Sequence, residues 1–211
     1  MTAAPSGPHL RTMRLSILTV LVLAAAPGPA AAQLSVRVGA GATLGNALVS
    51  EAIVYDDIIS LKTGVAPTLA LALGYPVAPR YQLLLEARIA SSGMTATSNE
   101  GDADLGTLRT IGVTVMAEGP LPYGMRFQIG GGAIKYSPSE ATGVFLADAP
   151  MKPMVTAGLG WVRALRPGLD LHLGGRWDMH EFTTTTLRQR GWSQAQRINR
   201  VAFTIGLERG F

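Results

Sequence analysis

The sequence contains no cysteine, so disulfide bonds cannot stabilise the folded chain. It has few charges, with 15% charged residues, and its mean hydropathy of +0.25 is apolar for a soluble protein. Beyond residue 33 no stretch is long and uncharged enough to form a transmembrane helix. Membrane β-barrels have this kind of composition, because only every second residue of their strands is apolar.

Net charge is also small once the first residues are set aside. The formal net charge of the 211-residue chain is +4, but Arg11 and Arg14 belong to the N-terminal segment, and without them acids and bases nearly balance. We therefore expect no nucleic-acid binding. The sequence contains no nucleotide-binding loop and no zinc-ligand spacing, so no cofactor and no metal site are expected.

The N-terminus has the pattern of a secretory signal peptide. Met13 and Arg14 precede an apolar run at 15–24, and three alanines, the last of them Ala32, precede Gln33. A basic residue, a short apolar core and a small-residue cleavage site predict a signal peptide over 1–32, removed after Ala32. A membrane anchor is the alternative, but the apolar run is too short for one. Residues 33–211 are expected to form one domain.

The segment at 199–211 alternates between large apolar residues and small or polar ones, and it ends in Phe211. Strict alternation has the period of a β-strand with one apolar and one polar face. Seven earlier segments alternate in the same way, and each is long enough to cross a membrane at a tilt. They are 34–44, 65–75, 81–91, 107–118, 125–136, 154–165 and 169–182; only Leu84, on a polar face, breaks the pattern.

The connections between these segments alternate in length. Short turns rich in proline and glycine lie at 75–80, 119–124 and 166–168, and long polar segments lie at 46–64, 92–106, 137–153 and 183–198. Membrane barrels have this asymmetry, with short turns at one end and long loops at the other. The sequence therefore predicts an all-β fold, an eight-stranded antiparallel up-and-down transmembrane β-barrel. The alternative is a soluble exported barrel or sandwich, whose polar face would be rich in lysine, glutamate and asparagine rather than glycine.

The polar faces predict a barrel interior filled by paired charges. An eight-stranded barrel has room only for side chains, and unpaired charges there are costly. Strand adjacency pairs Glu118 with Arg126 across a short turn, and Arg37 with Glu208 where the first and last strands meet. The predicted interior polar network comprises Arg37, Glu86, Arg88, Glu118, Arg126, Asp170, His172, Arg176, Asp178, His180 and Glu208, with Arg200 also facing inward.

The signal peptide, the eight alternating strands and the terminal phenylalanine resemble the small outer-membrane β-barrels of Gram-negative bacteria, the OmpA-, OmpX- and OmpW-like proteins. The resemblance implies a monomer in the outer membrane, in contact with its lipid and lipopolysaccharide. It also implies that the last strand is the signal recognised by the outer-membrane assembly machinery, carried here by Phe203, Ile205, Leu207 and Phe211. Arg209 departs from the pattern, since an apolar residue is usual at that place.

The loops carry weaker signals. The acidic turn at 99–104 lacks the ligand spacing of a calcium-binding loop, so a solvated loop tip is the plainer interpretation. The apolar segment at 52–60 fits either a lid over the barrel mouth or a partner contact. Arg188, Arg190 and Arg197 make the last loop basic, which suits lipopolysaccharide phosphates.

These features predict a structural or surface-interacting membrane protein without catalysis. A small channel for apolar solutes is the alternative, and it requires an axial or lateral opening. A lipid A-modifying enzyme is the third hypothesis, because Asp178 and His180 lie near the outer end of their strand and Ser193 follows in the next loop. No serine is spaced as a nucleophile beside His180, so an enzyme is not expected.

Overall fold

The computed structural model describes residues 34–54, 57–140, 145, 150–189 and 195–211. The predicted signal peptide, 1–32, lies outside the described residues. The fold is all-β, with two short helical turns, η1 (Pro122–Gly124) and α2 (Thr185–Gln189). No helix in the described ranges combines the length and apolarity needed to cross a membrane.

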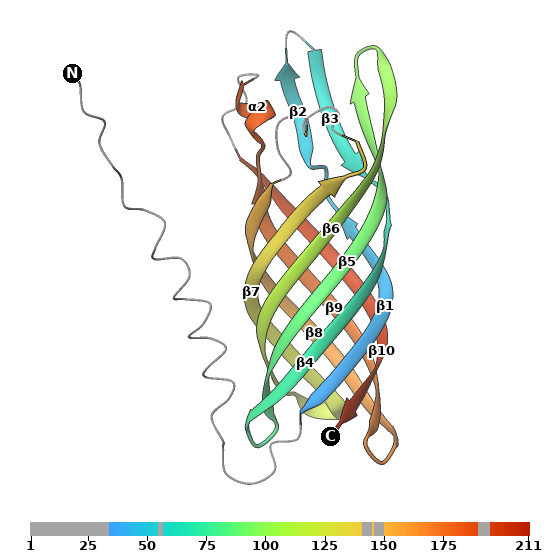
Figure 1. Cartoon of the computed structure of the whole chain (residues 1–211), viewed down its shortest axis with the longest axis vertical. Coiled ribbons are helices and arrows are strands. Elements are labelled where there is room, and N and C mark those ends of the chain that lie inside the picture. The colour runs from blue at the N-terminus through green and yellow to red at the C-terminus, as the bar shows by residue number, and fades with distance from the viewer. Residues whose placement is uncertain (1–33, 55–56, 141–144, 146–149, 190–194) are drawn as a thin grey trace, which may run out of the picture. The chain divides into compact units, whose positions relative to one another are not determined.

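Eight strands form a closed antiparallel ring (Figure 1). They are β1 (Ser35–Gly45), β4 (Ala66–Ala78), β5 (Tyr81–Ser98), β6 (Gly101–Pro120), β7 (Met125–Pro138), β8 (Met151–Arg166), β9 (Leu169–Phe182) and β10 (Gln196–Gly210). Each ring strand pairs with its neighbours in chain order, and β1 pairs with β10 to close the ring. The predicted eight-stranded up-and-down barrel is confirmed.

The alternation of the strands sorts side chains between the two faces of the wall as predicted. In β4, Leu69 is 65% exposed on the outside while Thr68 is 3% exposed on the inside. Leu84, which breaks the alternation, faces inward and is fully buried. It therefore joins the interior packing, and the strand keeps its register.

The two ends of the barrel differ. The connections at 79–80, 121–124 and 167–168 are short and lie at the end where the chain terminates, here called the turn end. At the opposite end, the loop end, a further hairpin follows β1 and consists of β2 (Val49–Val54) and β3 (Asp57–Thr63). The predicted difference between the two ends, with short turns at one and longer connections at the other, is therefore present.

One predicted loop is wrong. The segment 92–106 is a strand hairpin, because β5 continues to Ser98 and β6 begins at Gly101, which leaves a two-residue turn. Gly101 adopts a φ of 124°, which only glycine adopts readily. Of the acidic residues of this segment, Glu100 lies in the turn and Asp102 and Asp104 lie on β6, where the Asp104 carboxylate accepts a hydrogen bond from the Gly106 amide at 2.8 Å. The structure finds no cluster of metal-ligating side chains in the part of the chain it describes.

The hairpin of β2 and β3 pairs with the part of β5 that extends beyond the ring. Residues 60–63 of β3 pair with 94–97 of β5, so a four-stranded sheet in the order β2, β3, β5, β6 rises above the ring (Figure 1). The segment 52–60, proposed as a lid or a partner contact, forms much of this hairpin, although residues 55 and 56 lie outside the description. Its backbone belongs to a sheet that extends the wall upward.

Glycines on the inner face serve two purposes. A Cβ on Gly132 would lie 1.9 Å from the Val113 carbonyl oxygen, so this glycine permits close approach of β7 to β6. A Cβ on Gly160 would instead lie 2.6 Å from the His172 Nε2, so this glycine leaves room for a buried side chain. The first kind of glycine thus lets neighbouring strands approach, and the second makes room for an interior side chain.

Candidate functional site

The candidate site is the barrel interior, which carries two ionic clusters and an apolar cap. The first, the turn-end cluster, consists of Arg37, Gln82, Glu118, Arg126, Gln128 and Glu208. Arg37 Nη2 lies 3.0 Å from Glu118 Oε2 and 2.8 Å from Glu208 Oε2. Arg126 Nη1 lies 2.8 Å from Glu118 Oε1. Both pairs predicted from strand adjacency are therefore present.

Glu118 is the centre of this cluster and is 1% exposed. Besides the two arginines, its carboxylate accepts hydrogen bonds from Gln82 Nε2 at 2.6 Å and from Gln128 Nε2 at 2.7 Å. A buried carboxylate is tolerated when its lone pairs are filled by charged and polar donors. The contact between Arg37 and Glu118 crosses the lumen between strands that are not neighbours, so it ties opposite walls together.

The second group, the central cluster, consists of Glu86, Arg88, Arg176, Asp178 and Arg200. Arg176 bridges the two acids, with Nη1 2.5 Å from Glu86 Oε1 and Nε 2.6 Å from Asp178 Oδ1. Arg88 Nη2 also lies 3.0 Å from Glu86 Oε1. Arg200 donates to the Thr110 hydroxyl at 3.0 Å. The cluster links strands on different sides of the barrel and fills its middle.

The apolar cap closes the interior at the loop end. It consists of Leu48, Val49, Leu61, Met94, Leu108, Ile134, Tyr136, Phe145, Met154, Phe182, Leu187 and Ile198, all buried. Aromatic rings form its middle, since Tyr136 lies 5.1 Å from Phe182 and 6.3 Å from Phe145 between ring centroids. The interior is therefore polar only toward the turn end and in the middle, whereas the sequence predicts a polar filling throughout.

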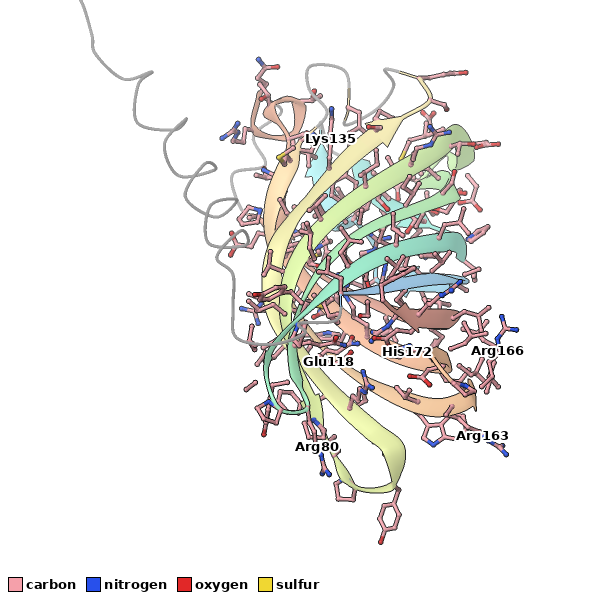
Figure 2. All side chains as sticks on the ribbon, turned by 60° about the horizontal axis from the view of Figure 1, so that its bottom comes forward. Arg80, Glu118, Lys135, Arg163, Arg166 and His172 are labelled. Atoms are coloured by element: carbon pink, nitrogen blue, oxygen red, sulfur yellow. The ribbon has the colours of Figure 1, made fainter. Side chains whose placement is uncertain are left out.

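The three remaining members of the predicted network lie apart from the ion pairs. His180 contacts the Tyr136 hydroxyl through Nε2, directly below the apolar cap. His172 is 4% exposed, and its Nε2 has no partner among the described residues. Figure 2 shows His172 and Glu118 inside the barrel, with Arg163 and Arg166 outside it. Asp170 lines the opening at the turn end and makes no ion pair with any described residue.

Small cavities lie inside the barrel among the described residues. One of about 20 Å³ lies between the two clusters and is lined by residues that include Arg37, Arg88 and His172. Another, also about 20 Å³, lies below the cap beside Tyr136 and Arg200. A single water needs a cavity of roughly 10–15 Å³, so each has room for little more than a water molecule.

The second cavity reaches a break in the backbone pairing of the barrel wall, called the wall gap below. The pairing of β1 with β4 ends at Thr43 and Ala66, and the chains rejoin where the Leu48 amide donates to the Leu61 carbonyl at 2.8 Å. Between these points the segments 44–47 and 62–65 diverge. The Asn46 amide donates to β10 at the Asn199 carbonyl, and the Gly64 amide donates to β5 at the Gly93 carbonyl.

Sequence reasoning missed several interior residues. Gln82 and Gln128 complete the shell of Glu118, yet a neutral amide on a polar face has no distinctive pattern. Nothing in the sequence marks Tyr136 as a site residue, although its inward position follows from the alternation of β7. The cap residues come from the loop-end parts of many strands, such as Met94 of β5 and Leu108 of β6, and from the segments between strands, and only the closed fold brings them together.

No family model and no curated protein matches this sequence. Solved structures do match its fold. The outer-membrane protein OprG from Pseudomonas aeruginosa has a TM-score of 0.61 at 10% identity, covering 86% of this chain and 96% of that one. The outer-membrane protein AlkL has a TM-score of 0.54 at 10% identity, covering 88% and 94%. Neisserial surface protein A has a TM-score of 0.53 at 10% identity, covering 84% and 97%. The resemblance is confirmed at the level of fold: this chain is folded as a small outer-membrane β-barrel.

Proposed function

We propose that the protein is an integral β-barrel of the Gram-negative outer membrane that acts as a structural or surface-interacting protein, without catalysis. The observation that carries the proposal is the inverted distribution of side chains. Leucine, valine, isoleucine and phenylalanine cover the outside of the wall, and ion pairs fill the inside. Lipid favours this distribution, whereas in water each exposed large apolar side chain forgoes about 1.5–3 kcal/mol of burial energy.

The filled interior supports a role that does not depend on axial transport. Two ionic clusters and the apolar cap follow one another along the lumen, and the cavities between them have room for only about one water each. The sheet of β2, β3, β5 and β6 would extend beyond the membrane surface at the loop end. It is the natural candidate for contacts at the cell surface.

The position of His180 supports a non-catalytic role. Its side chain is 4% exposed, contacts the Tyr136 hydroxyl, and lies below the apolar cap. A lipid A substrate would have to displace the cap to reach it. Ser193, the hypothetical nucleophile, lies outside the described residues.

Two partners follow from this proposal. The outer-membrane assembly machinery would recognise the last strand through Phe203, Ile205, Leu207 and Phe211, all of which are exposed on the outside of the barrel. Lipopolysaccharide would contact the loop end, where Arg188 and Arg197 are exposed. Arg190 lies outside the described residues.

Membrane fractionation combined with a heat-modifiability gel tests the proposal. We expect the mature chain in the outer-membrane fraction, with a gel mobility that changes on boiling because the closed sheet resists detergent. Recovery in the soluble periplasmic fraction, with one mobility before and after boiling, would contradict the membrane location.

A side passage for small apolar solutes is the second candidate, and the wall gap is the observation that favours it. The cavity below the cap is lined by Gly45, Asn46 and Gly64 of the gap and by Tyr136 of the interior. Because the chain has no cysteine, a G45C/G64C variant can be bridged by a short thiol cross-linker without side reactions. If solutes use the gap, cross-linking should abolish their uptake into proteoliposomes and reduction of a cleavable linker should restore it. Equal uptake in all states, or none above empty liposomes, excludes this passage.

A further inference from the structure

Three arginines lie on the outside of the barrel wall at the turn end, and their side chains pair with no carboxylate among the described residues. Arg163 and Arg166 are on β8, and Arg209 is on β10; all three are exposed. Figure 2 shows Arg163 and Arg166 extending away from the wall. The Arg209 guanidinium lies 5.3 Å from the centre of the Phe211 ring, which holds it at the rim.

The strand register brings the three arginines together around β9. Leu171 pairs with Arg163 on one side, and Leu169 pairs with Arg166 on one side and Arg209 on the other. A register shift between Ala164 and Arg166 places Arg166 opposite Leu169, on the outer face. Neighbouring strands are about 4.8 Å apart, so Arg166 and Arg209 begin about 10 Å apart with an apolar side chain between them. The group is called the rim arginines below.

Above the rim arginines an apolar groove runs across β7, β8, β9 and β10. Its volume is about 680 Å³, and its lining includes Phe127, Leu159, Gly175, Trp177 and Phe203. Gly175 creates the hollow, because it faces outward between Leu159 of β8 and Phe203 of β10. A Cβ at this position would meet only the edge of the Phe203 ring, at 3.7 Å. Nothing in the backbone therefore requires glycine here.

The spacing between groove and arginines matches one membrane leaflet. Gly175 and Leu169 are six residues apart on β9, a distance of about 20 Å along the strand. Barrel strands tilt by about 40°, which reduces this to roughly 15 Å along the barrel axis. Half of a hydrocarbon core of about 30 Å is the same length.

We propose that this face of β8, β9 and β10 binds one anionic glycerophospholipid of the periplasmic leaflet, the leaflet at the turn end, because outer-membrane barrels have their short turns on the periplasmic side. The rim arginines hold the phosphate, and one acyl chain lies in the groove over Gly175. Guanidinium groups bind phosphate in bidentate geometry, and three cations that pair with no carboxylate among the described residues favour a headgroup that carries net negative charge. The inference rests on the proposed membrane location, since only a bilayer supplies both parts of this ligand.

Native mass spectrometry of the detergent-solubilised full chain tests the proposal. Phosphatidylglycerol is the anionic probe, and phosphatidylcholine with the same acyl chains is the neutral one. We expect one phosphatidylglycerol per protein, retained in preference to phosphatidylcholine. The R163Q/R166Q/R209Q variant should lower the affinity for phosphatidylglycerol by about a hundredfold, since each arginine near an anionic headgroup contributes about 1 kcal/mol, roughly a fivefold factor. The R80Q/R109Q/K135Q variant removes the same charge elsewhere on the exposed surface and should bind as the wild type does.

A separate variant tests whether the groove contributes to lipid binding. G175L fills the hollow without a backbone clash, and we expect occupancy to fall by about threefold or more, as for loss of one or two buried methylene contacts. A87L adds the same side chain to the outer face of β5, on the opposite side of the ring, and should have no effect. Glycerol phosphate, which has the headgroup chemistry without acyl chains, should fail to displace the lipid.

Equal retention of both lipids, or unchanged occupancy in the arginine variant, would overturn the proposal. Displacement by glycerol phosphate would overturn the role of the groove and with it the assignment to a lipid. Heat modifiability of the same preparations separates these outcomes from failure of the proposed function. A heat-modifiable barrel that binds no lipid selectively refutes only the lipid site. A soluble chain whose gel mobility does not change on boiling refutes the membrane location itself.

Discussion

Arg37 and Glu208 join the first and last strands of the barrel across 171 residues of sequence, with Arg37 Nη2 2.8 Å from Glu208 Oε2. Their Cα atoms are partners in the pairing of β1 with β10, so the ion pair lies on the seam where the sheet closes. The same guanidinium also reaches Glu118 on the far wall. One side chain thus connects the closing seam to the opposite side of the lumen.

Replacing Arg37 should therefore destabilise the closed barrel strongly. In R37L, Glu118 and Glu208 lose their shared cation, and removal of one partner from a buried ion pair costs about 3–5 kcal/mol. We expect a lower urea midpoint in detergent micelles and a mobility shift at lower temperature. R80Q, in an exposed turn, is the control and should unfold as the wild type does. An unchanged midpoint for R37L would show that the seam holds without the cluster.

Truncating the centre of the apolar cap should weaken the loop end without opening a pore. Phe182 is fully buried against Tyr136 and Phe145, and its replacement by alanine costs about 3–5 kcal/mol. Planar-bilayer recordings of F182A should remain silent, because the central cluster still fills the lumen below. L159A, on the lipid-facing wall, should lower the free energy of unfolding much less. Steady conductance from F182A would mean that the cap alone seals the barrel.

The two classes of inner-face glycine should respond differently to alanine. In G160A the new Cβ meets the His172 ring, and the H172A substitution removes that obstacle. The double variant should therefore be more stable than the sum of the two single effects predicts, as measured by urea unfolding in a double-mutant cycle.

G132A has no comparable rescue, because its Cβ would meet the carbonyl of Val113 on the neighbouring strand. We expect most of this variant to remain unfolded, without a heat-dependent mobility shift. G175A is the control, since its Cβ has ordinary contacts only. Normal folding of G132A would indicate that β6 and β7 can separate locally at little cost.

The terminal aromatic should matter for assembly more than for stability. Phe211 is 65% exposed and lies beyond the last paired residue of β10, held by a hydrogen bond from its amide to the Leu34 carbonyl. F211A should reduce the folded, heat-modifiable fraction in the outer membrane of cells several-fold, while refolding of the purified chain into detergent changes little. F127A, at the same end of the barrel, serves as the control. Equal losses in cells and in detergent would argue against an assembly signal.

Much of the fold follows from sequence because strand alternation is a local property. Period-2 patterning identified all eight ring strands, and the pattern of β9 predicted its bounds, Leu169–Phe182, without error. Side-chain pairs between neighbouring strands can also be predicted from sequence, since adjacency in an up-and-down barrel follows chain order. That is why the contacts of Glu118 with Arg126 and of Arg37 with Glu208 were predicted from residue positions alone.

The upper hairpins were harder to predict. Residues 92–106 are small, polar and rich in glycine, which is typical of a loop, yet they form the outer parts of β5 and β6. They are strands because β3 pairs with β5 there and because the two extensions pair with each other. These hydrogen bonds come from residues distant in sequence, and they override weak local preference.

By itself, the sequence determined the strands, their inner and outer faces, their order around the ring and the pairs that adjacency creates, because alternation and short turns act locally. Only the tertiary structure decided which side chains meet across the lumen. The contact of Arg37 with Glu118, the apolar cap and the rim arginines around Leu169 depend on tilt, register and curvature of the closed sheet. Those properties arise only when all eight strands pair at once, and no single segment carries them.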